Sequence, residues 1–198
     1  MSRNSELASM FHTMATILEI KGENVFKVNA NIKVARVLED LVEDVATIED
    51  VSSIAGIGKS SAMKINQFIA TGVMDDYNTL VASIPAGLLD VMRVQGLGPK
   101  TARRLWQEAA VTDIPSLREA IGDGRLEALP RMGKKTIQNI TESLDFLATN
   151  ANRTRIGTAM PIAKALVNRL QQLKGVSKIS FAGSLRRGKE TIGDIDIL

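Results

Sequence analysis

Cysteine is absent from this chain of 198 residues, and histidine occurs once, as His12. The chain therefore has no disulfide and no thiolate metal site, and a single imidazole argues against a zinc centre. No apolar run approaches the roughly 20 residues that span a bilayer, and the N-terminus lacks the basic-then-apolar order of a signal peptide. These absences favour a reducing, cytoplasmic setting.

Charge is distributed unevenly along the chain. Hydrophobic residues make up 44% and charged residues 24% of the sequence, which is typical of a soluble globular protein. Residues 1–50 contain 5 Lys or Arg and 9 Asp or Glu, a net charge of −4, whereas residues 151–198 contain 9 and 3, a net charge of +6. The basic C-terminal stretch suits a polyanionic ligand.

Apolar residues recur at helical spacing over most of the sequence. The spacing predicts helices over 4–20 and 25–43, a short helix over 47–53, and a later helix over 159–173. Residues 176–182 alternate between apolar and polar, which predicts a strand. The sequence therefore predicts a mainly α protein with a small α/β part near the end of the chain.

One pattern occurs three times. Residues 54–65 and 94–105 both read apolar-x-Gly-apolar-Gly-x-x-x-Ala-x-x-apolar, and residues 129–140 form a weaker copy with Arg131 at the first glycine position. Two glycines around one apolar residue allow a tight turn with positive φ at the glycines. The middle residue then enters the core, and the second glycine opens a helix whose free N–H groups attract anions.

This repeat resembles the helix-hairpin-helix element, which binds the DNA backbone without reading sequence, although a plain helical connector is the alternative. We call residues 54–65, 94–105 and 129–140 the first, second and third hairpin. The predicted DNA-binding residues are Gly56, Gly58, Lys59, Gly96, Gly98, Lys100, Thr101, Gly133 and Lys134.

The segment 183–198 combines a Gly-Ser turn, basic side chains and an Asp-x-Asp pair. In a strand, Asp194 and Asp196 point to the same face, where two carboxylates can hold divalent cations for attack on a phosphate. The turn offers backbone N–H groups and a hydroxyl to a triphosphate. Countercharge would come from Arg186, Arg187 and Lys189.

This segment resembles the nucleotidyltransferase signature of family X DNA polymerases, the polymerase beta family, and every fixed position of that signature is present. The hairpins look closest to bacterial and archaeal members. The resemblance implies that Asp194 and Asp196 are catalytic and bind Mg²⁺ or Mn²⁺. It implies nucleotide binding by Gly183, Ser184, Arg187, Gly193 and Arg155. The third carboxylate of the family lies on a later strand, so we expect the chain as given not to polymerise alone.

The resemblance also implies three parts in order. These are a lyase-like helical domain with the first hairpin (1–84), a second helical domain with the other hairpins (85–150), and the beginning of a nucleotidyltransferase palm (151–198). In the family, hairpin carbonyls hold Na⁺ or K⁺. Here the corresponding residues are Ser52, Ile54, Ile57, Met92, Val94 and Leu97.

Lys64 stands where lyase-competent relatives carry the Schiff-base nucleophile that removes a 5′-deoxyribose phosphate. An amine attacks an aldehyde only when it is neutral. Lys27 and Lys33 are expected nearby. Ser60 and Asn31 replace a lysine and a tyrosine of those relatives, which leaves lyase activity open.

Together these features predict a DNA-directed DNA polymerase that fills gaps in DNA repair, including base excision repair. Its partners would be gapped or nicked double-stranded DNA and deoxynucleoside triphosphates, and it would act as a nucleoid-associated cytoplasmic monomer. Two alternatives stay open: a stand-alone, non-catalytic DNA-binding module, and a lyase that uses Lys64. The sequence leaves open whether a phosphoesterase domain follows.

Overall fold

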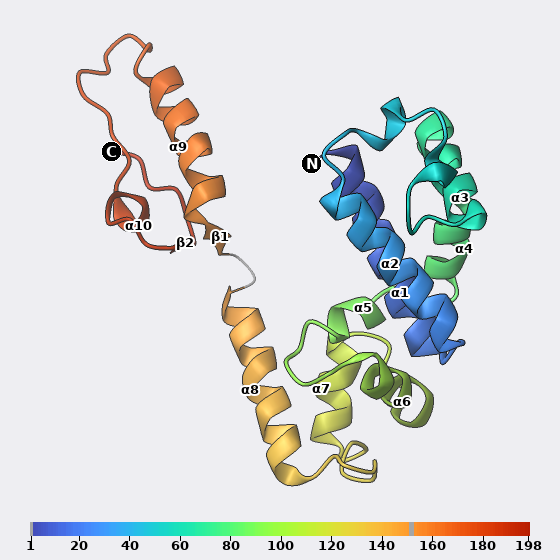
Figure 1. Ribbon diagram of the computed structural model, residues 1–198. Helices are drawn as coiled ribbons and strands as arrows, with labels where there is room; N and C mark the ends of the chain where they lie inside the picture. Colours follow the sequence, from blue (N-terminus) through green and yellow to red (C-terminus); the bar gives the residue numbers. More distant parts are fainter. Residues whose placement is uncertain (1, 151–152) are drawn as a thin grey trace. The chain divides into compact units, whose positions relative to one another are not determined.

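The computed structural model describes residues 2–150 and 153–198 and divides into two compact units, Met1–Ser143 and Leu144–Leu198 (Figure 1). The boundary between the units falls inside helix α8 (Lys134–Asn150). The domain boundaries expected after residues 84 and 150 stay predictions.

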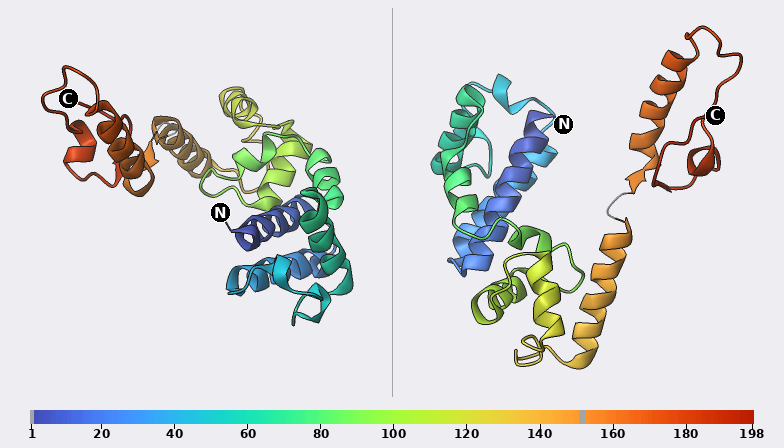
Figure 2. Two further views of the ribbon diagram at one scale, coloured as in Figure 1. Left: turned by 90° about the horizontal axis from the view of Figure 1, so that it is seen from above. Right: turned by 180° about the vertical axis from the view of Figure 1, so that it is seen from behind.

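Two long helices, α1 (Arg3–Lys21) and α2 (Val25–Asp40), lie side by side and carry the first core (Figures 1 and 2). The Ser2 hydroxyl caps α1, and Gly22 ends it with φ 71°, a left-handed conformation that glycine adopts without steric cost. The Asn24 side chain then caps α2. The prediction of a helix over 4–20 is confirmed.

Helix α2 ends three residues before the predicted end at residue 43 because a buried side chain binds the following backbone. The Asn4 amide donates hydrogen bonds to the carbonyls of Leu41 (3.2 Å) and Glu43 (2.6 Å). Its oxygen accepts a bond from the Val45 N–H (2.8 Å). Asn4 is only 7% exposed, so these bonds satisfy a polar group that would be costly to bury alone.

The short helix expected over 47–53 is wrong. Two separate 3₁₀ turns, Val45–Thr47 and Val51–Ser53, occupy this stretch. Each follows an aspartate, Asp44 or Asp50, whose carboxylate accepts a bond from the backbone two residues on. Such side-chain bonds favour turns over a continuous helix.

The remaining helices of the N-terminal unit are short and follow one another closely. They are α3 (Lys59–Thr71), α4 (Asp75–Ala82), α5 (Leu88–Val91), α6 (Pro99–Ala109), α7 (Ile114–Gly122) and the first part of α8. Leu105 on α6, Leu117 on α7 and Leu126 in the turn between α7 and α8 are fully buried, whereas α4 has no buried residue.

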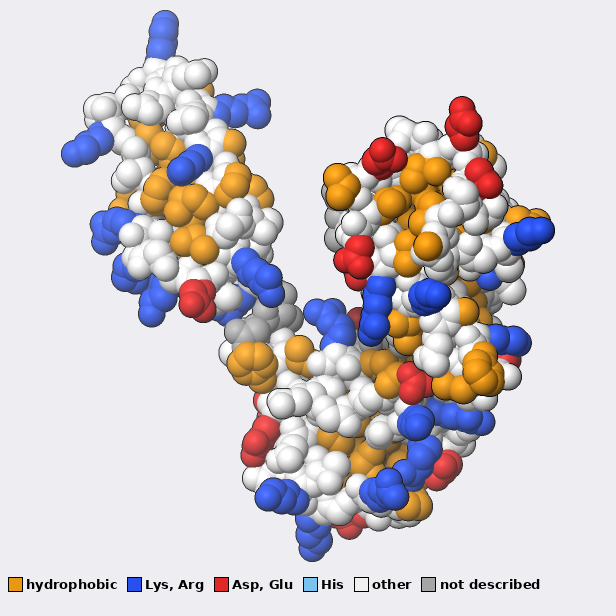
Figure 3. Space-filling view, in the orientation of Figure 1, with side chains coloured by type: hydrophobic (Ala, Val, Ile, Leu, Met, Phe, Trp, Pro, Cys, Tyr) orange, Lys and Arg blue, Asp and Glu red, His pale blue; other side chains and the backbone are white. Residues whose placement is uncertain are grey.

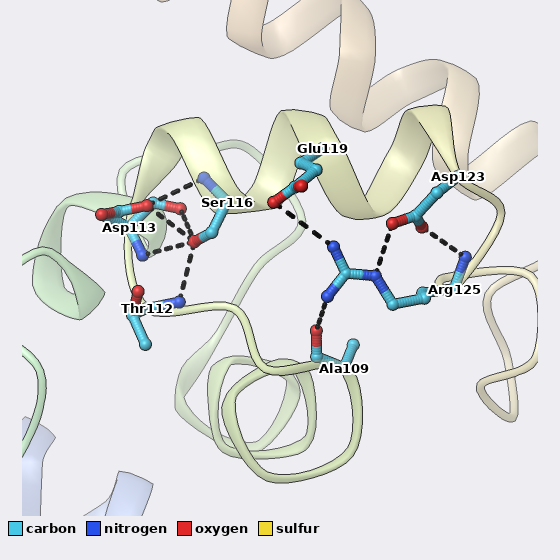
Figure 4. Close-up of polar contacts among 7 residues, drawn as sticks. All are labelled: Ala109, Thr112, Asp113, Ser116, Glu119, Asp123 and Arg125. Atoms are coloured by element: carbon cyan, nitrogen blue, oxygen red, sulfur yellow. Dashed lines mark hydrogen bonds and ion pairs between the residues drawn. The ribbon is translucent and has the colours of Figure 1, made fainter.

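The loop that enters α7 is held by a capping box, shown in Figure 4. The Asp113 carboxylate accepts bonds from the Ser116 hydroxyl (2.6 Å) and backbone N–H (2.8 Å). These bonds hold the pKa of Asp113 below its usual value, because they stabilise the ionised carboxylate. Asp113 and Ser116 therefore each bind the other's backbone N–H, and this pair of bonds fixes the first turn of α7.

The C-terminal unit contains β1 (Thr154–Arg155), α9 (Ile156–Leu170), the single turn α10 (Gly183–Arg186) and β2 (Thr191–Ile192). The two strands pair antiparallel, with Thr154 opposite Ile192. A small core of Ala159, Ala163, Leu185 and Ile192 joins them to α9. The prediction of a mainly α fold with a small α/β part is confirmed.

Two predictions in this unit need correction. The helix expected over 159–173 begins and ends three residues earlier, at Ile156 and Leu170. The strand expected over 176–182 is wrong for its first half. Only 180–182 pair with 196–198, through Ser180 with Leu198 and a single bridge from Phe181 to Ile197. Within the described ranges, no helix is both long and apolar enough to cross a membrane.

Candidate DNA-binding hairpins and nucleotide site

All three hairpins contain the same backbone turn, although the third lacks its first glycine. In each, the N–H of the middle apolar residue donates to the carbonyl three residues earlier. The bonds are Ile57 to Ile54 (3.0 Å), Leu97 to Val94 (3.1 Å) and Met132 to Leu129 (3.1 Å). The middle residues are 4%, 3% and 5% exposed, as the repeat predicted.

Positive φ occurs at the first glycine position only. Gly56 has φ 102° and Gly96 has φ 88°, whereas Gly58 and Gly98 are extended, with φ −79° and −84°. The expectation of positive φ at both glycines is therefore wrong. Arg131, at the first glycine position of the third hairpin, adopts φ 65° and so keeps the turn.

The second glycine of each hairpin opens a helix. That glycine's carbonyl accepts the first bond of each helix. The donors are Ala62 at Gly58 (2.9 Å), Ala102 at Gly98 (2.9 Å), and both Thr136 (2.9 Å) and Ile137 (3.1 Å) at Gly133. No side chain caps α3 or α6. The N–H groups ahead of these bonds are therefore placed to meet an anion such as a phosphate.

Exposed cations surround these helix starts. Lys59, Lys100 and Lys134 are exposed, as binding to DNA phosphates would require, and Thr101 is half-buried. Lys33 on α2 adds a cation at the first hairpin, because its Cε would touch a Cβ placed on Gly56 (3.0 Å). Lys33 was predicted near Lys64, but it is not among the residues that line the Lys64 pocket.

Of the carbonyls expected to hold Na⁺ or K⁺, those of Ile54, Ile57, Val94 and Leu97 lie in the hairpin turns, and those of Ser52 and Met92 lie two residues before them. Those of Ile54 and Val94 accept the turn hydrogen bond, and each keeps a second lone pair for a cation. The wider set, with Ser52, Ile57, Met92 and Leu97, stays a prediction.

Lys64 lines a pocket of about 510 Å³ between α1, α2, α3 and α4. Its side chain is 22% exposed, and its ammonium lies 3.0 Å from an Asp76 carboxylate oxygen. Lys27 lines the same pocket but is paired with Glu23 (3.0 Å). The pocket thus holds the candidate nucleophile in an ion pair that it would have to leave before attacking an aldehyde.

In the C-terminal unit, the Gly-Ser turn lies directly against one of the two paired aspartates. Gly183 has φ 54°, and a Cβ on it would overlap the Asp196 carboxylate. The Ala182 N–H donates to the Asp196 carbonyl (2.8 Å), which holds the two segments together. The hydroxyl of Ser184 is buried and has no partner among the described residues. A buried hydroxyl without a partner is the kind of group that a bound phosphate oxygen would satisfy.

Asp194 and Asp196 are exposed, whereas Ile195 and Ile197 between and after them are half-buried. The segment forms no regular strand beyond β2, apart from the single bridge at Ile197, so the prediction that both carboxylates share one face stays a prediction. Oxygen donors are what Mg²⁺ prefers, so the pair fits two ligands of a metal site. In residues 2–150 and 153–198, no group of three or more His, Cys, Asp or Glu is placed to hold a metal.

The basic side chains of this unit have different surroundings. The Arg153 side chain donates to the Thr191 hydroxyl (3.0 Å) and carbonyl (2.7 Å) of β2. Its guanidinium also lies beside Gly193. Arg155 and Arg187 are exposed. Figure 3 shows Lys and Arg side chains over the visible face of this unit, where acidic side chains are few.

Two family models match the chain: a helix-hairpin-helix domain over residues 2–74 and a SAM-like helix-hairpin-helix tandem over residues 88–145. The first range contains the first hairpin, and the second range contains the other two. The three hairpins read from the repeat therefore coincide with two independently recognised helix-hairpin-helix regions.

Curated relatives match nearly the whole chain. The DNA polymerase/3′-5′ exonuclease PolX of Bacillus subtilis (strain 168) is 34% identical over 193 residues, which are 98% of this chain and 34% of that protein. The DNA polymerases lambda of Rattus norvegicus and Arabidopsis thaliana are each 24% identical, over 98% of this chain and 31% and 34% of their own lengths. The chain thus spans about a third of the length of these relatives.

Proposed function

We propose that this chain, which belongs to the family X DNA polymerases, provides the duplex-binding hairpins and two metal-binding carboxylates of a gap-filling repair polymerase. Its substrates would be gapped or nicked double-stranded DNA and deoxynucleoside triphosphates, and it would act as a monomer. Its relatives are named DNA polymerases, which supports this reaction class.

The observation that carries the proposal is the contact between the Gly-Ser turn and the second aspartate. Gly183 brings its backbone against the Asp196 carboxylate, with the unpartnered Ser184 hydroxyl beside it in the chain. A triphosphate bound at the turn would therefore lie next to the carboxylate pair. That is the arrangement a nucleotidyl transfer to a primer needs.

Each part of the chain then has a separate role. The hairpin turns would hold the duplex through backbone phosphates, without preference for sequence. Asp194 and Asp196 would hold Mg²⁺ or Mn²⁺, which when bound supplies stabilisation of charge on the attacking and leaving oxygens. Ser184 and Arg187 would orient the triphosphate, and Arg155, which lies opposite Thr191 in the β1–β2 pair, would assist. A monovalent cation at the first two hairpins would order their carbonyls.

Gap filling by the protein purified from its native source tests this function. The substrate is a duplex with a one-nucleotide gap, supplied with Mg²⁺ and each deoxynucleoside triphosphate in turn. We expect incorporation of the nucleotide that pairs with the template. The proposal would be overturned by an absence of incorporation, or by incorporation that ignores the template base.

A lyase is a second candidate, because Lys64 lines a pocket large enough for a sugar phosphate. Borohydride reduction should trap Lys64 on a 5′-abasic phosphate, and Lys64→Ala should abolish the adduct. Since Asp76 pairs with the ammonium, Asp76→Asn should raise the yield of trapped adduct severalfold. If Lys64→Ala leaves the adduct unchanged, Lys64 is not the nucleophile.

A further inference from the structure

Arg104 links the second hairpin to the third. It lies on α6, the helix opened by Gly98, and its Nη1 donates to the Pro130 carbonyl (2.9 Å). Its Nε lies 3.5 Å from Glu108 of the same helix, and the side chain is 30% exposed. Pro130 directly precedes Arg131 in the turn of the third hairpin. The guanidinium of one hairpin helix is therefore attached to the turn of the next.

A second contact runs in the opposite direction. The N–H of Gln95, in the turn of the second hairpin, donates to the hydroxyl of Ser143 on α8 (2.9 Å). Helix α8 is the helix opened by the third hairpin. Gln95 and Pro130 hold the same position in their repeats, so each turn is attached to the helix of the other hairpin.

The chemistry of each contact matches the residue at that position. Gln95 offers a backbone N–H, and it meets a hydroxyl acceptor. Pro130 has no N–H and offers only a carbonyl, and it meets a guanidinium donor. Neither contact uses the N–H groups at the helix starts, so those groups remain placed for phosphate.

The segment between the two hairpins is also fixed, as Figure 4 shows. Arg125 donates to the Ala109 carbonyl at the end of α6 (2.9 Å) and to Asp123 at the end of α7 (2.6 Å). It also lies 3.5 Å from Glu119. Together with the capping box at Asp113, this leaves little freedom between the second and third hairpins.

We propose that Arg104 is a positioning residue that, with Ser143, fixes the second and third hairpins as one rigid two-point grip on duplex DNA. This inference rests on the proposed function. Because the two helix starts are held at a set spacing, binding of a phosphate at one hairpin places the other hairpin beside a second phosphate of the same duplex. Loss of the attachment would let the third hairpin move, and its contribution to affinity would then fall.

A double-mutant cycle on the 198-residue chain tests the inference. The variants are Lys134→Gln, Arg104→Met and the double variant, and the readout is the dissociation constant for a fluorescent duplex at fixed salt. Lys134→Gln alone should weaken binding about fivefold, the effect of losing one phosphate contact. In the Arg104→Met background the same change should weaken binding by less than about twofold, because residues in one coupled unit do not act additively.

The matched control is Arg103→Met, which removes the same charge one residue away. Arg103 donates to Gln107 on its own helix rather than to Pro130. In that background, Lys134→Gln should keep its full effect. Ser143→Ala provides a second route, since it removes the reciprocal contact and should reproduce the coupling if Arg104→Met fails to fold.

The outcomes separate the two claims. If neither Lys134→Gln nor Lys59→Gln affects duplex binding, the hairpins do not hold DNA and the proposed function fails. If both weaken binding but the cycle with Arg104→Met and with Ser143→Ala is additive, the hairpins bind independently and only the positioning role is overturned. Unchanged unfolding temperatures would show that the variants are folded.

Discussion

Asp196→Asn is expected to reduce nucleotide addition by the native-length protein about a thousandfold while leaving duplex affinity within about twofold. The variant removes one negative charge from the carboxylate pair but keeps the side-chain shape. The carboxylate is exposed and lies far along the chain from the hairpins. Single-turnover gap filling and a parallel binding titration would separate the two effects. Asp40→Asn, an exposed aspartate at the end of α2, serves as the matched control and should leave both quantities unchanged.

A steric substitution tests the same site without removing any charge. Gly183→Ala places a methyl group into the Asp196 carboxylate, which must move. We expect gap filling to fall about a hundredfold, because displacement by about 1 Å is enough for such a loss. Gly188→Ala is the control. Gly188 also has positive φ, at 64°, but open space surrounds its Cβ position. Equal losses in the two variants would mean that backbone strain, rather than the carboxylate contact, determines the effect.

Gly56→Ala is expected to weaken duplex binding about tenfold or more. The first hairpin turn requires φ 102° at this position, and a Cβ there would press on Lys33 and Val37 at 3.0 Å. The turn must therefore shift, and with it the helix start at Gly58. Strain from positive φ should also cost about 1–2 kcal/mol of unfolding free energy.

Gly72→Ala separates that strain from the turn itself. Gly72 ends α3, the same helix that the first hairpin opens, with φ 73° and nothing near its Cβ position. It should lose comparable stability in chemical denaturation but keep its duplex affinity. Similar affinity losses in both variants would show that binding follows global stability and not the turn.

The sequence predicted the hairpins well because their determinants are local. A glycine at a position needing positive φ, an apolar residue that fills the core and a small residue in the following helix are all visible in the repeat. Arg131 is a position where the local sequence does not predict the backbone. Its left-handed backbone could not be read from residue type, because tertiary contacts such as Arg104 to Pro130 act on the same turn.

The secondary-structure predictions that were wrong elsewhere depended on residues far away in the chain. The end of α2 depends on Asn4, which is 37 residues from the carbonyl of Leu41. The strand expected over 176–182 pairs only where 196–198 lies beside it. Alternation of apolar and polar residues is a weak predictor of a strand when few partner strands are available to pair with it. The contact between Gly183 and Asp196 joins two segments in the same way. The nucleotidyltransferase signature identified both residues as site residues, but it did not predict that they touch.

The affinity of the 198-residue chain for a duplex with a one-nucleotide gap, measured across a range of salt concentrations, tests the central claim most directly. If three hairpins neutralise about 3–6 phosphates, the logarithm of the association constant should fall linearly with the logarithm of salt, with a slope of about −3 to −5. Gly56→Ala should lower the affinity, and Asp196→Asn should not. Absence of binding at low salt, or binding that salt does not affect, would contradict the account.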